Sequence, residues 1–262
     1  MPEQLLFLFS APRSGSTFLR GALGAHPDIT LTNESAWVAA LRKAELLTCT
    51  PSMQAIDDGE GFTTVGLIPH AYLAAHATAF AAAAREYVSA FARSIGATTR
   101  YFGDKIHSHN DAAFLLRAFP KTTLVFLVRD LRDVLVSSYT FQEKQATAWQ
   151  GADFTTRCDH LARLTHQMHA MHRDRGGPLV RYEELVQDPA TEILRILAAL
   201  GLAPSPEVER WLAEDAKTLF ASHGTSDDPR ASIGRWRRML DARQLAEVEA
   251  RLTPALAAFG YA

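Results

Sequence analysis

A short loop near the amino end combines small residues with a single arginine. A strand that ends in such a turn and then starts a helix aims backbone N–H groups, a positive helix end and one cationic side chain at a single anion. Here Pro12 and Gly15 would shape the turn, and Arg13 would supply the charge. The pattern therefore predicts a phosphate-binding loop. The loop Ala11-Pro12-Arg13-Ser14-Gly15-Ser16-Thr17-Phe18 follows the apolar run Leu5-Leu6-Phe7-Leu8-Phe9.

The loop differs from the one that binds nucleoside triphosphates in ATPases and GTPases. That loop has the spacing Gly-x-x-x-x-Gly-Lys-Ser/Thr, which residues 11–18 do not follow. An ATPase or GTPase is therefore disfavoured, and we expect a different ligand that carries phosphate groups.

A second candidate anion site follows another apolar run. Arg129 comes directly after residues 122–128, and Ser137 follows it two helical turns later. The guanidinium can bind a phosphate through a charge-assisted pair of hydrogen bonds, and the hydroxyl can donate one more. Two anion sites on one sheet suit a ligand that has phosphates at both ends of a nucleoside.

With these two motifs the chain resembles the sulfotransferases that use 3′-phosphoadenosine 5′-phosphosulfate as the donor. The resemblance implies that residues 12–18 hold the 5′-phosphosulfate and that Arg129 and Ser137 hold the 3′-phosphate. It also implies that the donor is released as 3′,5′-adenosine bisphosphate and that the fold is the P-loop-like α/β fold of that family.

Two later segments are similar to the same family. Tyr182-Glu183-Glu184-Leu185, followed by Asp188-Pro189, is similar to the segment beneath the adenine, which implies that Tyr182 contacts the base. The segment 230–236 is similar to the loop that closes over the 3′-phosphate. By this analogy Arg230 and Ser232 touch that phosphate, Trp236 belongs to the same closing loop, and Phe18 packs on adenine.

The charge in the first loop departs from part of the family. Cytosolic animal sulfotransferases usually have lysine where this chain has Arg13, whereas bacterial members and tyrosylprotein sulfotransferases resemble this chain more closely. Arginine can stabilise the charge that develops on the leaving phosphate. It cannot serve as the proton donor.

Two residues are candidates for the base that accepts the hydroxyl proton. Glu34 lies as far after the loop arginine as the catalytic glutamate of tyrosylprotein sulfotransferases, and His107 lies where cytosolic sulfotransferases have their histidine base. Histidine has the better intrinsic pKa near neutral pH, whereas a glutamate would need desolvation. The sequence leaves both open, and either side chain could instead cap a helix. Lys105 fits a cation that stabilises the transferring group.

The elements that must position these residues alternate along the chain. We expect strands at 5–9, 29–32, 100–105, 122–128 and 179–182, and helices at 16–25, 36–48, 70–97, up to about 119, and 189–200. A Gly/Asp stretch at 57–61 reads as a loop. This alternation predicts an α/β fold with a central parallel sheet flanked by helices, whose ligands lie at the carboxyl ends of the strands.

Length and composition bound the organisation. A chain of 262 residues with 47% hydrophobic residues can bury one full core, so we expect a single domain over residues 1–262. The segments about 36–97 and 140–175 have no counterpart that the resemblance aligns. We expect them to be helical and to shape the acceptor pocket, and their Ala, Leu, Phe and Trp content favours an apolar or aromatic alcohol.

Several partners and sites are disfavoured. With 27 Lys and Arg against 29 Asp and Glu, the net charge of −2 gives no reason to expect nucleic acid or an anionic membrane surface. The run 5–9 is too short for a membrane anchor, so we expect a cytoplasmic protein. Cys49 and Cys158 are too few for a disulfide framework, and the oligomeric state is not readable. We expect no metal site, although His160, His166, His169 and His172 fall in one segment.

The resemblance, with the motifs that carry it, implies a sulfotransferase that moves a sulfuryl group in line from 3′-phosphoadenosine 5′-phosphosulfate to the hydroxyl of a small molecule. No metal is required, because the donor is already activated. The alternatives are a nucleotide-dependent phosphotransferase and a catalytically inactive protein that only binds the donor.

Overall fold

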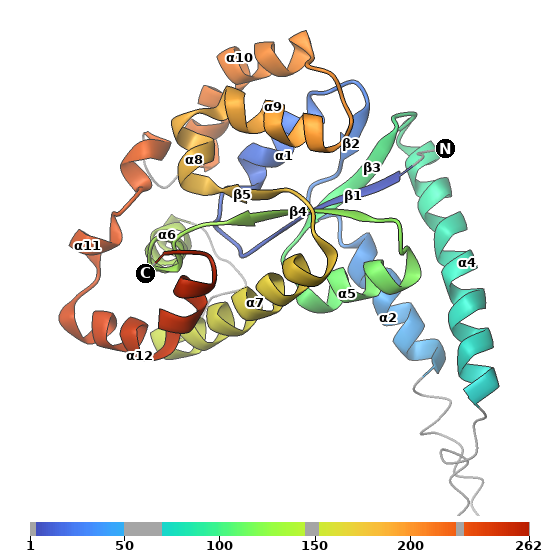
Figure 1. Cartoon of the computed structure of the whole chain (residues 1–262), viewed down its shortest axis with the longest axis horizontal. Helices are drawn as coiled ribbons and strands as arrows, with labels where there is room; N and C mark the ends of the chain where they lie inside the picture. Colours follow the sequence, from blue (N-terminus) through green and yellow to red (C-terminus); the bar gives the residue numbers. More distant parts are fainter. Residues whose placement is uncertain (1–3, 50–69, 145–151, 224–227, 262) are drawn as a thin grey trace, which may run out of the picture.

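The computed structural model describes residues 4–49, 70–144, 152–223 and 228–261 (Figure 1). Within them one sheet has the strand order β2-β3-β1-β4-β5, and every neighbouring pair is parallel. The predicted central parallel sheet is therefore confirmed, and each expected strand is present with ends shifted by one residue or so. The strands are β1 (Gln4–Ser10), β2 (Ile29–Leu31), β3 (Tyr101–Ile106), β4 (Thr123–Val128) and β5 (Leu179–Arg181).

Helices follow or link the strands along the chain. The described helices are α1 (Ser16–Gly24), α2 (Trp37–Cys49), α4 (His70–Ser94), α5 (His109–Ala118), α6 (Leu131–Lys144), α7 (Phe154–Arg175), α8 (Tyr182–Gln187), α9 (Pro189–Ala199), α10 (Pro206–His223), the 3₁₀ helix η2 (Pro229–Ser232), α11 (Trp236–Met239) and α12 (Ala242–Ala258). The loop expected at 57–61 lies outside the described residues.

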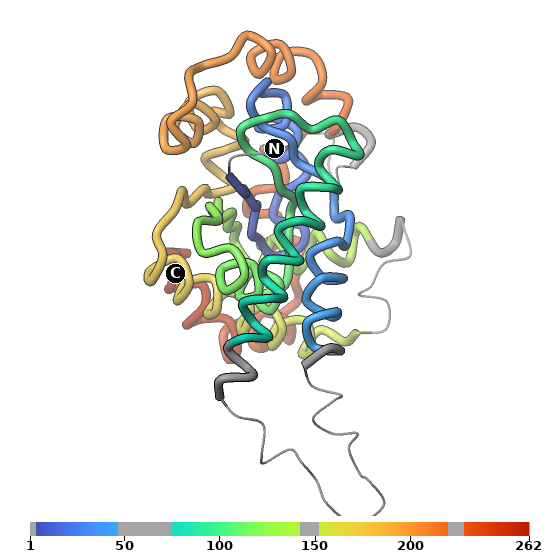
Figure 2. Tube along the Cα trace, turned by 90° about the vertical axis from the view of Figure 1, so that its right-hand side faces the viewer, coloured from blue at the N-terminus to red at the C-terminus, as the bar shows by residue number. Residues whose placement is uncertain are grey.

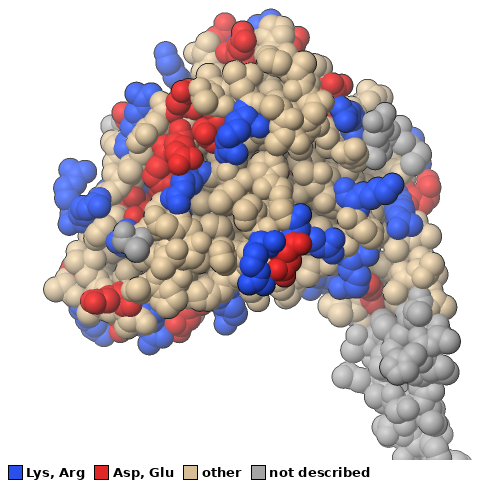
Figure 3. All heavy atoms as spheres, in the orientation of Figure 1, with Lys and Arg blue, Asp and Glu red and all other residues tan. Residues whose placement is uncertain are grey.

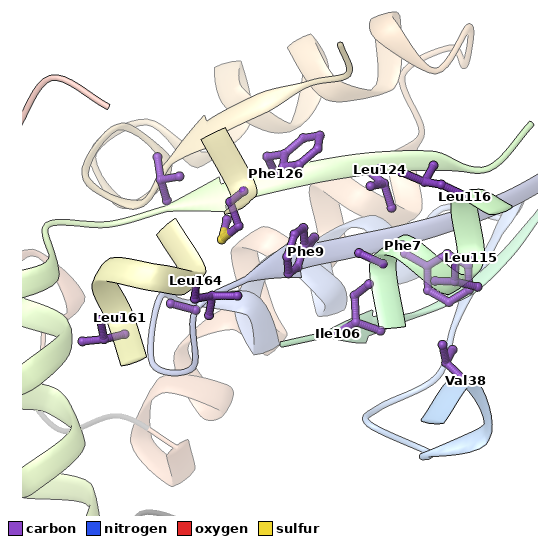
Figure 4. Packing of buried hydrophobic residues seen from close by; sticks show 14 of the residues in the cluster. Phe7, Phe9, Val38, Ile106, Leu115, Leu116, Leu124, Phe126, Leu161 and Leu164 are labelled. Atoms are coloured by element: carbon purple, nitrogen blue, oxygen red, sulfur yellow. The ribbon is translucent and has the colours of Figure 1, made fainter. Parts of the chain in front are cut away.

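Helices cover both faces of the sheet, as the view in Figure 1 shows. Successive side chains of a strand point to opposite faces, so the apolar run of β1 serves two cores at once. Leu6 and Leu8 belong to the core under α1, α8, α9 and α10, while Phe7 and Phe9 belong to the core under α2, α4, α5, α7 and α12. All four side chains are fully buried. Figure 4 shows Phe7 and Phe9 packed among residues of β4, α5 and α7.

Helices α2 and α4 run side by side, as the turned view in Figure 2 shows. Two ion pairs join α2 to α5. Arg42 Nε lies 2.6 Å from Asp111 Oδ1, and Arg117 pairs with Glu45. These contacts fix α2 against α5, so the segment that leads into α2 after β2 has a defined place.

The register of the sheet brings three strand ends to one edge. Phe9 of β1 pairs with Ile106 of β3, and Ser10 pairs with Leu127 of β4. The residues that follow these three strands are the ones that the sequence singled out: the loop from Ala11, then His107, then Arg129. Ligands of parallel α/β sheets bind at this edge.

Across the described part of the chain, no helix combines the length and the apolar character needed to cross a membrane. The face drawn in Figure 3 carries charged side chains of both signs, interspersed among uncharged ones.

Candidate active site

The loop between β1 and α1 has two residues in the left-handed region. Arg13 has φ +67° and Gly15 has φ +95°, whereas Ser14 between them does not have a positive φ. Such alternation turns successive N–H groups toward one side and forms an anion-binding concavity. Glycine is required at position 15 for a second reason, because a Cβ there would lie 2.5 Å from Cδ2 of Tyr182. Phosphate binding by this loop stays a prediction.

Arg13 places its guanidinium beside the loop. Its Cζ lies 3.8 Å from the centre of the Phe141 ring on α6. Burial, and next the neighbouring charge of Arg129, lower the pKa of Arg13 from 12.5 to about 10. The side chain is therefore still a cation at neutral pH.

Arg129 joins the loop to the carboxyl-terminal part of the chain. It follows β4 directly and is 5% exposed. Its Nη1 donates to the carbonyl oxygen of Arg13 at 3.0 Å, and its Nη2 donates to Ser232, to the carbonyl at 3.1 Å and to Oγ at 3.0 Å. The guanidinium also lies 4.1 Å from the ring centre of Tyr182. Three segments that the sequence singled out therefore meet at this arginine.

The side chains of Ser232 and Tyr182 contact each other and Arg129 in this structure. Ser232 Oγ donates to the carbonyl of Pro229 at 2.6 Å, accepts from Arg129, and lies 2.9 Å from the Tyr182 hydroxyl. A hydroxyl has one donor and two acceptor positions, so these contacts occupy the Ser232 side chain fully. Tyr182 is 5% exposed. Their contacts with a phosphate and with adenine stay predictions.

Sequence reasoning missed Asp133, a buried carboxylate on α6. Its Oδ2 accepts from the N–H of Gly234 at 2.6 Å, and its Oδ1 accepts from that of Trp236 at 2.9 Å. Burial is the main cause that raises the pKa of Asp133. The residue holds the segment that contains Ser232 and Arg235 against α6. Charge alternation in Arg129-Asp130-Leu131-Arg132-Asp133 was the only signal, and it does not reveal backbone partners 101 and 103 residues away.

Arg235 adds a third arginine to this region. Its pKa is lowered, first by burial and then by the charge of Arg129. Arg129 likewise lowers the pKa of Arg13. We refer to Arg13, Arg129 and Arg235 as the basic cluster. Like charges gathered in a partly buried place suit a ligand of high negative charge.

Other residues expected at the donor site have protein partners. Phe18 is 4% exposed and packs on Trp211, with 5.4 Å between ring centres, which leaves little of its ring for adenine. Arg230 donates to the carbonyls of Val186 and Gln187, each at 3.1 Å. The Trp236 ring lies under Arg132. Ser14, Ser16 and Ser137 are buried, and Pro12 is half-buried.

The residues proposed for proton transfer meet at one oxygen atom. Lys105 Nζ lies 2.8 Å from Glu34 Oε1, and His107 Nε2 lies 3.2 Å from the same atom. Lys105 Nζ also donates to Thr17 Oγ1 at 2.9 Å, which links this group to the start of α1, next to the loop after β1. The structure therefore brings Glu34, Lys105 and His107 together beside the loop, although they come from different segments of the chain.

The contacts determine the charge state of Glu34. The hydrogen bond with His107 is the largest cause, followed among the lowering causes by Lys105, and together they bring the pKa of Glu34 from 4.5 to about 2 against the opposing effect of burial. The carboxylate is ionised at neutral pH.

His107 Nδ1 lies 2.8 Å from the carbonyl oxygen of Ser10, which can only accept, so Nδ1 carries a hydrogen. Both ring nitrogens of His107 are engaged.

Two buried hydrogen-bond donors bear on whether the residues present suit a ligand that carries phosphate groups. Ser14 Oγ and Arg129 Nε have no hydrogen-bond partner among the described residues. Buried polar atoms are normally bonded, and both lie within the predicted anion site. A cavity of about 10 Å³ beside them, lined in part by Thr165 and Tyr261, has room for about one water. This cavity is too small for a nucleotide, so a bound nucleotide would lie outside it.

The histidines of α7 have partners of their own. His169 packs on Phe259 and His172 packs on Phe126, with ring centres 5.3 and 5.1 Å apart. In the residues that the structure describes, no three His, Cys, Asp or Glu gather as a metal site would require.

Cys158 is a buried free thiol. Burial raises its pKa to about 11, which makes the thiol unreactive. Cys49 ends α2.

Comparison with known proteins gives the family. Residues 6–206 match the sequence model of the sulfotransferase family. The fold is similar to the sulfotransferase domain of the Synechococcus PCC 7002 olefin synthase, with 20% identity, 100% of this chain and 96% of that chain covered, and a TM-score of 0.61.

Two further solved structures share the fold. Mouse sulfotransferase SULT7A1, complexed with PAP, is 13% identical, with 100% and 90% of the two chains covered and a TM-score of 0.60. Sulfotransferase STF9 from Mycobacterium avium is 17% identical, with 99% and 76% covered and a TM-score of 0.54. Since the family match spans most of the chain, this protein belongs to the sulfotransferase family, and the predicted enzyme class is confirmed.

Proposed function

We propose that this sulfotransferase moves a sulfuryl group from 3′-phosphoadenosine 5′-phosphosulfate to the hydroxyl of a small molecule. The observation that carries the proposal is the contact of Lys105 with both Thr17 and Glu34. This lysine links a phosphate-binding loop to a carboxylate that can take a proton. The basic cluster lies at the same edge of the sheet and would hold the rest of the donor.

The donor would span two anion sites. Backbone N–H groups of residues 12–18 and the Arg13 side chain would hold the 5′-phosphosulfate. Arg129, with Ser137 and with the charge of Arg235 nearby, would hold the 3′-phosphate. PAP in the mouse SULT7A1 structure, which has the same fold, supports a donor of this class.

The transfer needs no metal in this proposal. The acceptor oxygen attacks sulfur in line, the bond from sulfur to the bridging oxygen breaks, and that electron pair leaves with 3′,5′-adenosine bisphosphate. Arg13 and Lys105 stabilise the negative charge that develops on the leaving phosphate and the sulfuryl oxygens. The acceptor proton goes to a base of the protein.

Glu34 is the better candidate for that base. Both ring nitrogens of His107 are engaged, whereas only Oε1 of Glu34 is bonded within the described part of the chain. The Glu34 side chain is also 54% exposed. A carboxylate with a pKa of about 2 is a weak base. We therefore propose that the donor draws Lys105 toward the sulfuryl oxygens, which raises the pKa of Glu34 when the reaction needs it.

The acceptor would be an apolar or aromatic alcohol. Phe141 places an aromatic ring directly beside Arg13, so apolar surface lies next to the group that stabilises the transfer. Phe141 belongs to the segment 140–175, which we propose shapes the acceptor pocket together with 36–97 within one domain over residues 1–262. Retinol dehydratase, which has the same fold with a TM-score of 0.53, was solved with androsterone and PAP.

A thermal-shift titration with 3′,5′-adenosine bisphosphate, run beside ADP and ATP with magnesium, tests the proposal. Ligand at 100 times its Kd stabilises a protein by about 2.7 kcal/mol, and each kcal/mol raises the Tm of a chain of this size by about 2–4 °C. We expect the bisphosphate to raise the Tm, and Arg129→Ala to abolish that rise.

The other outcomes favour the alternatives. Stabilisation by ATP with magnesium alone would overturn the proposed donor and favour a phosphotransferase. A bisphosphate that stabilises the protein, together with a donor that is never consumed with any alcohol offered, would favour an inactive donor-binding protein.

A further inference from the structure

Asp104 is a buried carboxylate in β3 whose partners all lie in or next to the active site. It is 2% exposed. Oδ1 accepts from the backbone N–H groups of Glu34 at 2.8 Å and Lys105 at 2.7 Å. Oδ2 accepts from the N–H of Ser35 at 2.9 Å and from its hydroxyl at 2.6 Å. Four donors thus converge on one side chain, and a buried carboxylate needs such donors to remain charged.

The segment that Asp104 holds has an uncommon backbone. Glu34 has φ +50° and Ala36 has φ +58°, both in the left-handed region, where residues other than glycine are uncommon. Such conformations persist only where the surroundings hold them. Within this segment Asp104 binds the N–H groups of Glu34 and of Ser35, which lies between the two left-handed residues. Without this carboxylate the turn would lose the contacts that oppose its strain.

The turn determines where the Glu34 side chain lies. Glu34 Oε1 must reach Lys105 and His107, which extend from the end of β3, and its charge also faces Arg13 of the loop. Asp104 binds the backbone of Glu34 and of Lys105 through the same oxygen, Oδ1. One atom therefore fixes the relative position of the carboxylate and of the lysine that contacts it.

We propose that Asp104 is a positioning residue of this enzyme, which holds the turn at 34–36 so that the Glu34 carboxylate stays in contact with Lys105 and His107. The inference rests on the proposed function, since it assumes that Glu34 takes the acceptor proton. Asp104 itself is too buried to touch the substrate.

The variant Asp104→Asn tests this role. Its amide has one oxygen acceptor, and its NH₂ group would face N–H groups that now find a carboxylate oxygen. We expect kcat to fall by about 10-fold to 100-fold, as small misplacements of reacting groups do. The Kd for 3′,5′-adenosine bisphosphate should stay within about twofold, because the basic cluster lies around Arg129, which follows another strand, β4.

The pH profile separates positioning from a loss of stability. In Asp104→Asn the Glu34 carboxylate would move away from Lys105 and His107, so its pKa would rise and the acid limb of kcat/KM would move to higher pH. A variant that is only less stable would keep the acid limb in place. The matched control is Asp241→Asn, which changes an aspartate that accepts from the backbone N–H of Gln244 at the start of α12, outside the proposed site, and should leave the acid limb unchanged.

A double variant identifies the residue through which Asp104 acts. In a Glu34→Gln background, Asp104→Asn should lower kcat by no more than about twofold further, because coupled residues are not additive. If Asp104→Asn lowers kcat equally in both backgrounds, or leaves the acid limb in place, the inference is wrong. If Glu34→Gln alone keeps full turnover, the proposed base is wrong instead.

Ser35→Ala keeps the test available if Asp104→Asn does not fold. It removes only the hydroxyl bond of 2.6 Å to Asp104 and the bond of 2.9 Å to Thr32. We expect a smaller fall in kcat, with the acid limb displaced in the same direction. An unchanged acid limb in a folded Ser35→Ala enzyme would contradict the inference.

Discussion

Glu34 combines an exposed side chain with a strongly lowered pKa, because His107 and Lys105 both contact Oε1. A carboxyl group whose pKa is lower in the folded protein than in the unfolded chain stabilises the fold above its unfolded pKa. That contribution disappears as the pH falls from 4.5 toward about 2. The exposure of the side chain reduces the size of the effect.

Glu34→Gln and His107→Ala should separate the two candidate bases. Loss of a general base costs about 10²-fold to 10⁴-fold in rate, so we expect that fall in kcat for Glu34→Gln. His107→Ala removes the largest cause of the lowered pKa of Glu34, so the acid limb of kcat/KM should move to higher pH while turnover above that limb is largely kept. Rates measured from about pH 2 upward, a range that includes the acid limb of Glu34, would check both. A larger loss of kcat in His107→Ala than in Glu34→Gln would assign the base to His107.

At the scale of elements, the segment from η2 to α11 depends on α6. Asp133 binds the N–H groups of Gly234 and Trp236, and between these anchors lies Arg235 of the basic cluster. We expect Asp133→Asn to weaken binding of 3′,5′-adenosine bisphosphate by about 10-fold, since one lost buried hydrogen bond costs about 1–3 kcal/mol. Turnover at saturating donor should change little. Isothermal titration and saturation kinetics would check this, with Asp104→Asn as the opposite case.

Helices and strands could be predicted from the sequence where a short run of neighbouring residues is enough to determine the local structure. The apolar runs of β1 and β4, and prolines such as Pro27 and Pro120 after helices, located strands and helices to within a few residues. The roles of Arg13 and Arg129 stay predictions, whereas their positions after β1 and β4 could be predicted because each follows an apolar run. Asp104 and Asp133 could not, because their partners are backbone N–H groups distant in the sequence. Phe18 was placed by analogy, and its partner Trp211 lies on a helix that no motif indicated.

At the scale of the whole molecule, the strand order places the residues proposed for proton transfer on one side of β1 and Arg129 on the other. β1 lies between β3 and β4, so its loop reaches both the carboxylate group of Glu34 on one side and Arg129 on the other. Lys105 binds the loop at Thr17, and Arg129 binds it at the carbonyl of Arg13. This order explains how residues from distant parts of the chain meet at one edge of the sheet.

The end of the chain also supports this edge. The Tyr261 hydroxyl donates to Glu183 Oε2 at 2.7 Å, and Glu183 Oε1 accepts from the N–H of Asp130, the residue after Arg129. The side chain of Arg132 donates to the carbonyl of Tyr261 at 2.9 Å. Burial, and next the charge of Glu183, raise the pKa of Tyr261, so the hydroxyl remains a donor at all ordinary pH values.

Tyr261→Phe should therefore weaken both the fold and the donor site. It leaves Glu183 without one of its donors, which costs about 1–3 kcal/mol, and it loosens the turn that positions Arg129. We expect a lower urea midpoint with an unchanged m-value, together with a higher Kd for 3′,5′-adenosine bisphosphate. Tyr87→Phe, at a tyrosine that is 49% exposed on α4, is the control and should leave the midpoint unchanged. A normal Kd in a destabilised Tyr261→Phe protein would mean that the chain end stabilises the fold without positioning Arg129.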